Sequence, residues 1–341
     1  MTVERIGHVL QAFAIGDAMG MPTQLLTHAK ALELFNQDGP LGDARADHEL
    51  CPSLPGGTIT DDTHQLLILA DNLIAGEGAF DEPSFARELL SWEASMAAAG
   101  SLDLLGPSTK AALLALAQSV DPLSVSLAGT TNGGAMRIPA LACAIPVLPI
   151  RGAEALISST LEVNRLSHNS PYANLGCIAI ATMISAGIDG IDYDTALDAA
   201  LNSVVYLAER IDAADYNYLG DLKRLLFEVD HAHAIGGDEQ ALAYIDDEIG
   251  SSMESRESVV AAFAVAHLAQ HSPIRAAVAG ARLGGDSDTI AALASAMVAA
   301  FGVWEQPEQL AWQKVAGVNG LDFEPRARAL AALRENYHDE L

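Results

Sequence analysis

The sequence predicts an all-α fold, and three observations carry that prediction. Half of the 341 residues are apolar and only 5% are aromatic. Ala and Leu dominate, while runs of Val, Ile and Thr at period two are scarce, a composition that favours helices over sheets. Apolar residues recur at spacings of three and four, and Gly, Pro or Asn closes most of these stripes, as expected where a helix ends.

The individual elements follow from these stripes along the chain. The first two predict a helix near the N-terminus and another after residue 60: Ile6, Val9, Leu10 and Phe13, then Leu66, Leu67, Leu69, Ala70 and Leu73. The same periodicity predicts further helices at about 81–98, 106–118, 152–165, 171–186, 192–209, 216–232, 238–246, 256–270, 272–282, 289–301 and 324–338. The stretch from Glu305 predicts a closing helix pair, and the best strand signal, a weak one, lies at Val147 to Ile150.

Several predicted helices, at 171–186, 256–270 and 289–301, are apolar most of the way round, which is typical of buried central helices in a large bundle. No internal repeat, low-complexity tract or linker interrupts the chain, so we expect residues 1–341 to form a single domain. The loops at 36–60 and 120–134 are long and rich in Gly, Asp and Thr. Loops of that length in a compact domain tend to carry function, and we expect them on one face.

Charge and cysteine content narrow the possible partners and compartment. The formal net charge is -27, and only four of the 18 basic residues are Lys. A surface this acidic repels phosphate backbones and anionic lipids, so we expect neither nucleic-acid nor membrane binding. Cys51, Cys143 and Cys177 are widely spaced, and the N-terminus lacks the basic and apolar regions of a secretory signal. We therefore expect a cytoplasmic protein, with its oligomeric state left open.

Two adjacent aspartates, Asp61 and Asp62, stand between two threonines just before an apolar helix. One interpretation is a doubled N-cap, because an aspartate accepts a backbone N–H and suits the positive end of a helix. The other is a site for a cation. Taken alone, this segment favours the cap.

A second segment of the same kind favours the cation. GGDSDT, from Gly284 to Thr289, places Asp286 and Asp288 at the start of another long apolar helix. Pooled, the two segments offer four carboxylates and several hydroxyls, an all-oxygen set that suits Mg²⁺, Mn²⁺ or Ca²⁺ rather than Zn²⁺. Four carboxylates would neutralise two divalent ions, and two ions about 3.5–4 Å apart can polarise a leaving group and activate a water together.

Three segments in this order resemble a known family: GDAMGMPTQ at 16–24, GTITDDT at 57–63 and GGDSDTIAAL at 284–293. Together they resemble the ADP-ribosylglycohydrolase family, from near residue 5 to near residue 302. Its members include hydrolases that remove ADP-ribose from arginine on dinitrogen reductase, related ADP-ribosyl-acceptor hydrolases and the J1 crystallins. The resemblance implies an all-α fold, a centre of two Mg²⁺ or Mn²⁺ ions, and hydrolysis of an N- or O-glycosidic bond at C1″ of a ribose.

The resemblance also implies roles for individual residues. The implied metal ligands are Thr60, Asp61, Asp62, Asp286, Asp288 and Thr289. TTNGGAMRIPAL at 130–141 resembles the family's Asn-Gly-x-x-Met-Arg loop, and LSHNSPYANLG at 166–176 resembles its Thr-His-x-x-Pro segment. The implied substrate-binding residues are Asn132, Gly133, Gly134, His168, Asn169 and Ser287. Taken alone, His168 is as compatible with a hydrogen-bonded histidine of the core as with a site residue. Arg137 is likewise as compatible with an ion pair in the core as with a role at the site.

One position departs from the family pattern. Many members carry Glu at the end of the Gly-Asp-Ala-x-Gly-x-Pro-x-Glu motif, where it handles metal or water, and here the position is Gln24. A neutral amide cannot take a proton as a carboxylate does. Either a ligand aspartate, with Asp62 the nearest candidate, serves as base, or the substrate differs, or activity is weak. Ser167 and Ser170 also depart from the family's histidine segment.

The sequence therefore predicts a divalent-metal-dependent hydrolase of ribosyl linkages, with an ADP-ribosylated protein as the first expected substrate. Two alternatives stay open: a small ribosyl substrate such as a nucleoside, and a non-catalytic relative that binds metal or ligand, as the crystallin branch suggests. In the expected mechanism the acidic cluster stabilises an oxocarbenium-like state at C1″. The glycine-rich loop 129–134 and a helix N-terminus would cradle a phosphate.

Overall fold

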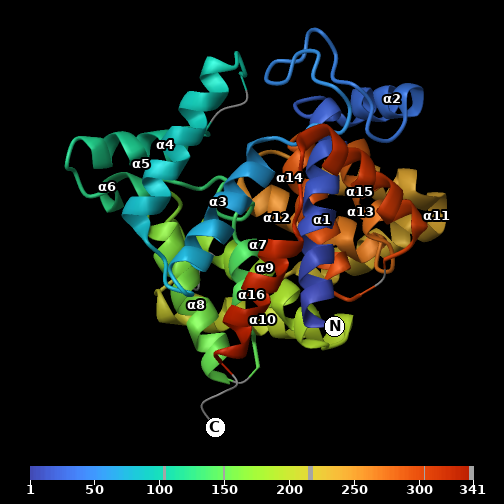
Figure 1. Ribbon diagram of the computed structural model, residues 1–341. Coiled ribbons are helices and arrows are strands. Elements are labelled where there is room, and N and C mark those ends of the chain that lie inside the picture. The colour runs from blue at the N-terminus through green and yellow to red at the C-terminus, as the bar shows by residue number, and fades with distance from the viewer. Residues whose placement is uncertain (103–104, 149, 214–217, 303, 338–341) are drawn as a thin grey trace.

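The computed structural model describes residues 1–102, 105–148, 150–213, 218–302 and 304–337. Over these residues the chain is helical and contains no β-strand, so the predicted all-α fold is confirmed (Figure 1). An isolated bridge between Thr131 and Glu254 joins two loops.

The helices largely follow the predicted stripes. In chain order they are α1 Thr2–Gly20, η1 Met21–Thr23, α2 His28–Asp38, α3 Asp61–Ala75, α4 Glu82–Ala98, α5 Pro107–Ala117, α6 Leu123–Ser126, α7 Pro139–Ala144, α8 Ile150–Arg165, α9 Pro171–Asp189, α10 Tyr193–Arg210, α11 Leu222–Glu248, α12 Ser255–Leu268, α13 Pro273–Leu283, α14 Ser287–Ala299, α15 Gln306–Asn319 and α16 Glu324–Glu335. The two helices predicted at 216–232 and 238–246 form one element, α11, with a kink where Gly236 and Gly237 leave helical geometry.

No strand forms among the described residues of 147–150, where the sequence has its best, weak strand signal. Ile150 begins α8, and residue 149 lies outside the described residues. The backbone N–H groups of Val147 and Leu148 donate to Oδ2 of Asp189, at 2.9 and 3.1 Å. A side chain thus takes the hydrogen bonds that a partner strand would have needed.

Two helices with almost no exposed surface form the centre of the molecule. Every residue of α14 is buried, and so is α9 from Ala173 to Ile188. α1 packs along α14, with α12 and α13 against them, while α7, α8 and α10 surround α9. By length and composition α9 could span a bilayer, but 89% of that window is buried inside the protein, as the sequence predicts for a central helix.

α1 and α14 approach each other backbone to backbone. A Cβ placed on Gly16 would lie 2.3 Å from the carbonyl oxygen of Ala291, and one placed on Gly20 would lie 2.3 Å from that of Ser287. The GDAMG segment therefore serves packing, because only glycine tolerates this approach. The close contact joins the end of α1 to the start of α14, where the second aspartate segment lies.

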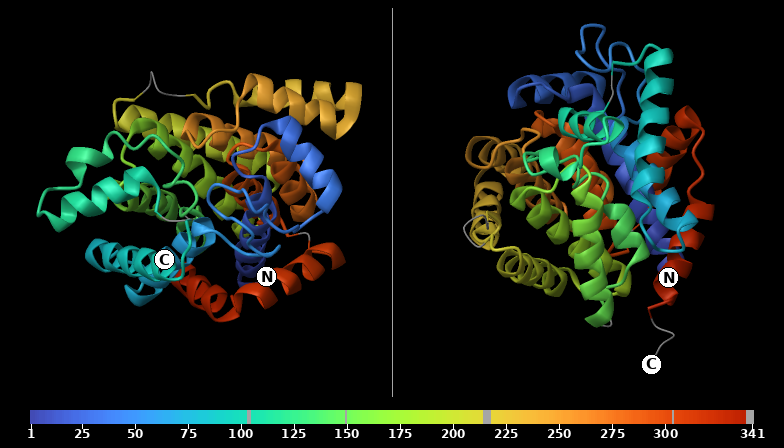
Figure 2. Two further views of the ribbon diagram at one scale, coloured as in Figure 1. Left: turned by 90° about the horizontal axis from the view of Figure 1, so that it is seen from above. Right: turned by 90° about the vertical axis from the view of Figure 1, so that its left-hand side faces the viewer.

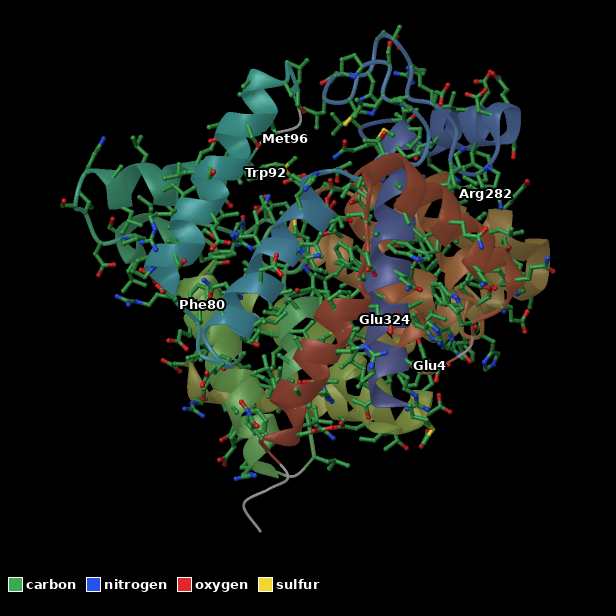
Figure 3. The ribbon with its side chains drawn as sticks, viewed as in Figure 1. Glu4, Phe80, Trp92, Met96, Arg282 and Glu324 are labelled. Atoms are coloured by element: carbon green, nitrogen blue, oxygen red, sulfur yellow. The ribbon has the colours of Figure 1, made fainter. Side chains whose placement is uncertain are left out.

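The helices α4, α5 and α6 project on one side of the bundle, opposite α11 (Figures 1 and 2). Trp92 of α4, labelled in Figure 3, packs against His64 of α3, with 5.6 Å between the ring centroids. This contact ties the projecting group to α3, which carries the first aspartate segment. The starts of α5 and α3 lie close together, because Pro107 and Asp61 line one pocket.

Candidate functional site

A pocket of about 280 Å³ lies where the first turns of α3, α5 and α14 face one another. Its polar lining includes most of the predicted site residues: Gln24, Asp61, Asp62, Asn132, Gly133, His168, Asp286 and Thr289. Leucine and methionine side chains supply most of its apolar wall: Leu50, Leu102, Leu105, Met136 and Met253. The start of α5 and the loop before Asn132 complete it with Gly106, Pro107, Thr109, Lys110 and Thr131. Segments more than two hundred residues apart in the chain thus share one pocket.

The N-cap of α3 is Thr60, and neither aspartate of the pair acts as the cap. The Thr60 hydroxyl accepts a hydrogen bond from the backbone N–H of Asp62 at 3.3 Å. Asp61 accepts from the side-chain amide of Gln65 at 2.7 Å. At α14, Asp286 occupies the N-cap position without a side-chain cap hydrogen bond. The cap interpretation therefore fails, and the aspartates are left for other interactions.

The two aspartate segments meet directly. Oδ1 of Asp62 accepts a hydrogen bond of 2.9 Å from the hydroxyl of Thr289, across 227 residues of sequence. Its Oδ2 lies 3.4 Å from the hydroxyl of Thr60. Asp62 is only 2% exposed. The hydroxyls of Thr289 and Thr60 therefore replace hydrogen bonds that water would donate to an exposed carboxylate.

Asp288 is the most unusual carboxylate of the cluster. It is completely buried, and among the described residues neither of its oxygens has a hydrogen-bond partner. Burial raises the pKa of Asp288 well above its usual range, and the carboxylates of Asp286, Asp62 and Asp17 raise it further. A buried polar group with no partner costs free energy, and a buried unpaired charge costs far more. Asp288 carries that cost unless a cation or a hydrogen-bond donor joins it.

Asp17 belongs to the same cluster, and sequence reasoning missed it. It lies on α1 at 0% exposure and accepts hydrogen bonds from the backbone N–H and the hydroxyl of both Thr60 and Thr63. Burial raises the pKa of Asp17 to about 6, although these hydrogen bonds oppose the rise. Asp17 fastens the first turn of α3 to α1. The signal was a lone acid in the apolar run FAIGDAMG.

Asp286 is held by two amide side chains. Asn132 donates to its Oδ2, and Gln24 also hydrogen-bonds to it. Burial raises the pKa of Asp286, while hydrogen bonds with Asn132, Thr289 and Gln24 lower it. Gln24 lines the pocket and is 8% exposed, and its buried Oε1 has no partner among the residues that the structure describes. Gln24 thus has an acceptor to offer where the family pattern has a carboxylate.

His168 lies at the pocket beside the glycine-rich loop. It is 2% exposed, and burial, together with the nearby Arg137 charge, holds the pKa of His168 well below its usual range. A Cβ on Gly133 would lie 2.7 Å from Cε1 of His168, so glycine makes room for the ring. Gly134 packs behind the loop, where a Cβ would meet Asn164 at 2.8 Å and Cys177 at 3.1 Å.

Four predicted site residues do not line this pocket, beyond the buried Asp288. Thr60 and Gly134 are buried behind it. Ser287 is fully buried and donates to the carbonyl of Gly20 at 2.9 Å, so it joins α14 to α1. Asn169 lines a different pocket, and its Oδ1 accepts from Asn174 at 3.1 Å. The structure therefore gives Ser287 and Asn169 structural positions and does not bring them to the site.

The donor set fits a hard divalent cation. Asp61, Asp62, Asp286 and Thr289 present oxygen atoms to the pocket, with Asp288 buried behind them. Within the described residues, no three acidic, His or Cys side chains form a ready-made metal cluster. Threonine hydroxyls and side-chain amides occupy most of these carboxylates, as described above. The unpartnered oxygens of Asp288 are the feature that a cation would satisfy.

Two known proteins are similar to this chain over most of its length. An uncharacterized protein of Escherichia coli (strain K12), YegU, is 33% identical over 338 residues, which cover 98% of each chain. An uncharacterized protein of Archaeoglobus fulgidus is 25% identical over 305 residues, 88% of each chain.

The fold and the family agree. A solved structure described as an ADP-ribosylglycohydrolase-related protein complex superposes with a TM-score of 0.64 at 21% identity, over 97% of this chain and 98% of that one, and so shares the fold. The model of the family described as ADP-ribosylglycohydrolase matches residues 2–339. With a match over nearly its whole length, this chain belongs to the ADP-ribosylglycohydrolase family.

Proposed function

We propose that the protein is a divalent-metal-dependent hydrolase that cleaves an N- or O-glycosidic bond at C1 of a ribose, with ADP-ribosyl linkages as its first substrate class. The observation that carries the proposal is Asp288, a fully buried carboxylate that lies among four other aspartates. Within the part of the chain that the structure describes, it has no hydrogen-bond partner. Such a cluster is costly unless cations join it. Family membership supports the reaction class, and we further propose that the protein acts in the cytoplasm.

The residues that would hold two Mg²⁺ or Mn²⁺ ions are the carboxylates and hydroxyls of the two segments: Thr60, Asp61, Asp62, Asp286, Asp288 and Thr289. When bound, such ions supply positive charge that polarises substrate oxygens and lowers the pKa of a coordinated water. Thr60 acts chiefly by capping α3 and bonding Asp17. The remaining five surround the pocket or lie directly behind it.

The residues of this chain then bind and orient the substrate. The acceptor oxygens of Asp61, Asp62 and Asp286 face the ribose and stabilise positive charge that develops at C1. We assign the role of base to Asp62, whose Oδ1 is held by Thr289. Gln24 cannot accept that proton, so its free Oε1 orients a substrate hydroxyl or water by hydrogen bonding.

A second substrate class has its own support in the shape of the pocket. Its volume of about 280 Å³ is at the lower limit of the roughly 300–1,000 Å³ typical of ligand pockets. Lys110, the lysine in its lining, is exposed and pairs with Glu93 at 3.2 Å. A nucleoside-sized ribosyl compound needs less space and less positive charge than a diphosphate. The test of function should therefore include small ribosyl substrates beside ADP-ribosylated protein.

The decisive experiment measures hydrolysis of ADP-ribosyl-arginine peptide and of simple nucleosides, in excess Mg²⁺ or in EDTA. We expect Asp61→Ala and Asp286→Ala to lose at least about 100-fold in kcat/KM and to bind Mg²⁺ more weakly. Asp247→Ala is the matched control, because Asp247 is an exposed acid on α11 in a second Asp-Asp pair.

Three outcomes separate the readings. Hydrolysis that needs metal and both aspartates supports the proposal, and the substrate panel selects the class. Equal rates in wild type and both variants would contradict the dimetal site. Tight Mg²⁺ binding with no turnover of any substrate would favour a non-catalytic metal-binding relative.

A further inference from the structure

A buried arginine stands directly behind the pocket. Arg137 is 0% exposed, and its hydrogen bonds go to uncharged groups: Oε1 of Gln65 at 3.4 Å, Oγ of Ser167 at 2.8 Å and Nδ1 of His168 at 3.1 Å. Burial lowers the pKa of Arg137 to about 10, so the guanidinium stays charged at neutral pH. Burying a guanidinium charge is costly. The contact between Arg137 and His168 indicates the function of this buried arginine.

The contact fixes the tautomer of His168. A guanidinium has donors and no acceptor, so the Nδ1 that it contacts must carry a lone pair. The hydroxyl of Ser167, 2.8 Å from the same nitrogen, can donate to it as well. Neutral imidazole with a free Nδ1 carries its proton on Nε2. The low pKa of His168 agrees with this neutral form.

The tautomer in turn fixes the direction of a hydrogen bond at the pocket. Nε2 of His168 lies 3.1 Å from the hydroxyl oxygen of Thr131. Since Nε2 carries the proton, the Thr131 oxygen accepts. The Thr131 hydroxyl proton then has no acceptor among the described residues, while Thr131 itself lines the pocket. Gly133 leaves room for the His168 ring in this position, because a Cβ on residue 133 would lie only 2.8 Å from Nε2.

We propose that Thr131 is a specificity-determining hydrogen-bond donor of the pocket, and that Arg137 and His168 are positioning residues that keep its hydroxyl proton directed to the ligand. The inference rests on the proposed function for the identity of the ligand. The facing aspartates only accept, so the ligand presents hydroxyls to them. It presents an oxygen or nitrogen acceptor, such as a ring oxygen, a base carbonyl or a phosphate oxygen, to Thr131.

The tautomer is tested without any activity. ¹⁵N-histidine-labelled protein at pH 7.5 gives long-range ¹H–¹⁵N correlations, and the His168 signals are identified by their absence in His168→Gln. We expect a pyridine-like Nδ1 and a protonated pyrrole-like Nε2. A protonated Nδ1, or an imidazolium, would overturn the relay. If His168→Gln fails to fold, Thr131→Val identifies the same signals by their shift, because Thr131 lies 3.1 Å from Nε2 of His168.

The donor is tested by ligand binding. Calorimetry with ADP-ribose, adenosine and ribose in Mg²⁺ compares wild type with Thr131→Val, which keeps the shape and removes the hydroxyl, and with Thr131→Ser, which restores it. We expect Thr131→Val to weaken binding about three- to tenfold and Thr131→Ser to stay within about twofold of wild type. Equal affinities in all three proteins would overturn the donor role. If no probe binds wild type, the donor role fails together with the proposed substrate class, and the tautomer result still stands.

Discussion

Gly20 and Ser287 fasten α1 to α14 at the edge of the site. A Cβ on Gly20 would lie 2.3 Å from the Ser287 carbonyl oxygen, and the Ser287 hydroxyl donates to the Gly20 carbonyl at 2.9 Å. Asp17 precedes Gly20 by about one helical turn, and Asp288 follows Ser287 directly. This single contact therefore brings together the carboxylates of Asp17 and Asp288, which are 271 residues apart in sequence.

Replacing Gly20 by alanine should damage stability and site together. The added methyl group must displace α14 backbone, which costs about 1–3 kcal/mol or more in a packed core, and the shift separates Asp17 from Asp288. We expect a lower melting temperature and weaker Mg²⁺ binding. Gly7→Ala is the matched control on the same helix, because its Cβ would meet only the Ala327 Cβ at 4.0 Å. Equal losses in both variants would show that the contact has no special role.

Asp288→Asn should have opposite effects with and without metal. In EDTA the variant should unfold at a higher temperature than wild type, because it removes a buried acid that has no partner. In excess Mg²⁺ the order should reverse, because bound ligand stabilises the native state by about 3 kcal/mol at 100 times its Kd. Thermal unfolding in the two buffers checks both. A variant less stable than wild type in EDTA would contradict this account of Asp288.

The same pair of proteins should diverge with pH. A carboxyl group whose pKa is raised in the folded state contributes stability that is complete below its unfolded pKa of about 4 and is lost as pH rises. Burial raises the pKa of Asp288, so metal-free wild type should lose stability relative to Asp288→Asn from pH 5 to pH 8, by at most about 1.4 kcal/mol per pH unit. Asp17, with a pKa of about 6, adds a similar slope to both proteins. Urea unfolding in EDTA across this range measures the difference, and a constant difference would refute it.

The sequence predicted the helices well because their apolar stripes record burial. It missed α2, in which Ala31 is the buried residue and no stripe exists. It also missed two short helices, α7 and the α6 that lies inside the predicted loop 120–134, because so few residues show no periodicity. It found four aspartates because they stand at helix starts, beside turn residues. Asp17 was missed because a buried acid within an apolar helix looks like a local exception until α3 is placed against it.

Neighbouring polar residues were harder to sort. Ser287 and Asn169 share segments with site residues, yet their side chains form hydrogen bonds elsewhere. The Ser287 hydroxyl donates to the Gly20 carbonyl, and Oδ1 of Asn169 accepts from the Asn174 amide. Helix periodicity fixes which residues share a face, and it does not say which face meets solvent at a loop-to-helix junction. Thr131, by contrast, drew no attention as one of two adjacent threonines, and only the ring of His168 reveals its role.

Gln24→Glu tests the departure from the family pattern. The Gln24 side chain hydrogen-bonds Asp286 and leaves Oε1 unpartnered at the pocket. A carboxylate there adds one negative charge beside Asp286, so we expect Mg²⁺ affinity to rise about tenfold and metal-free stability to fall. It also supplies a second proton acceptor, so kcat should rise on substrates whose cleavage is limited by water activation. Gln24→Leu, which removes the acceptor without adding charge, should raise KM instead. Calorimetry of Mg²⁺ binding and steady-state kinetics measure these effects. Unchanged Mg²⁺ affinity and kcat in Gln24→Glu would mean that residue 24 contacts neither the metal nor the attacking water. Substrate recognition would then explain the glutamine.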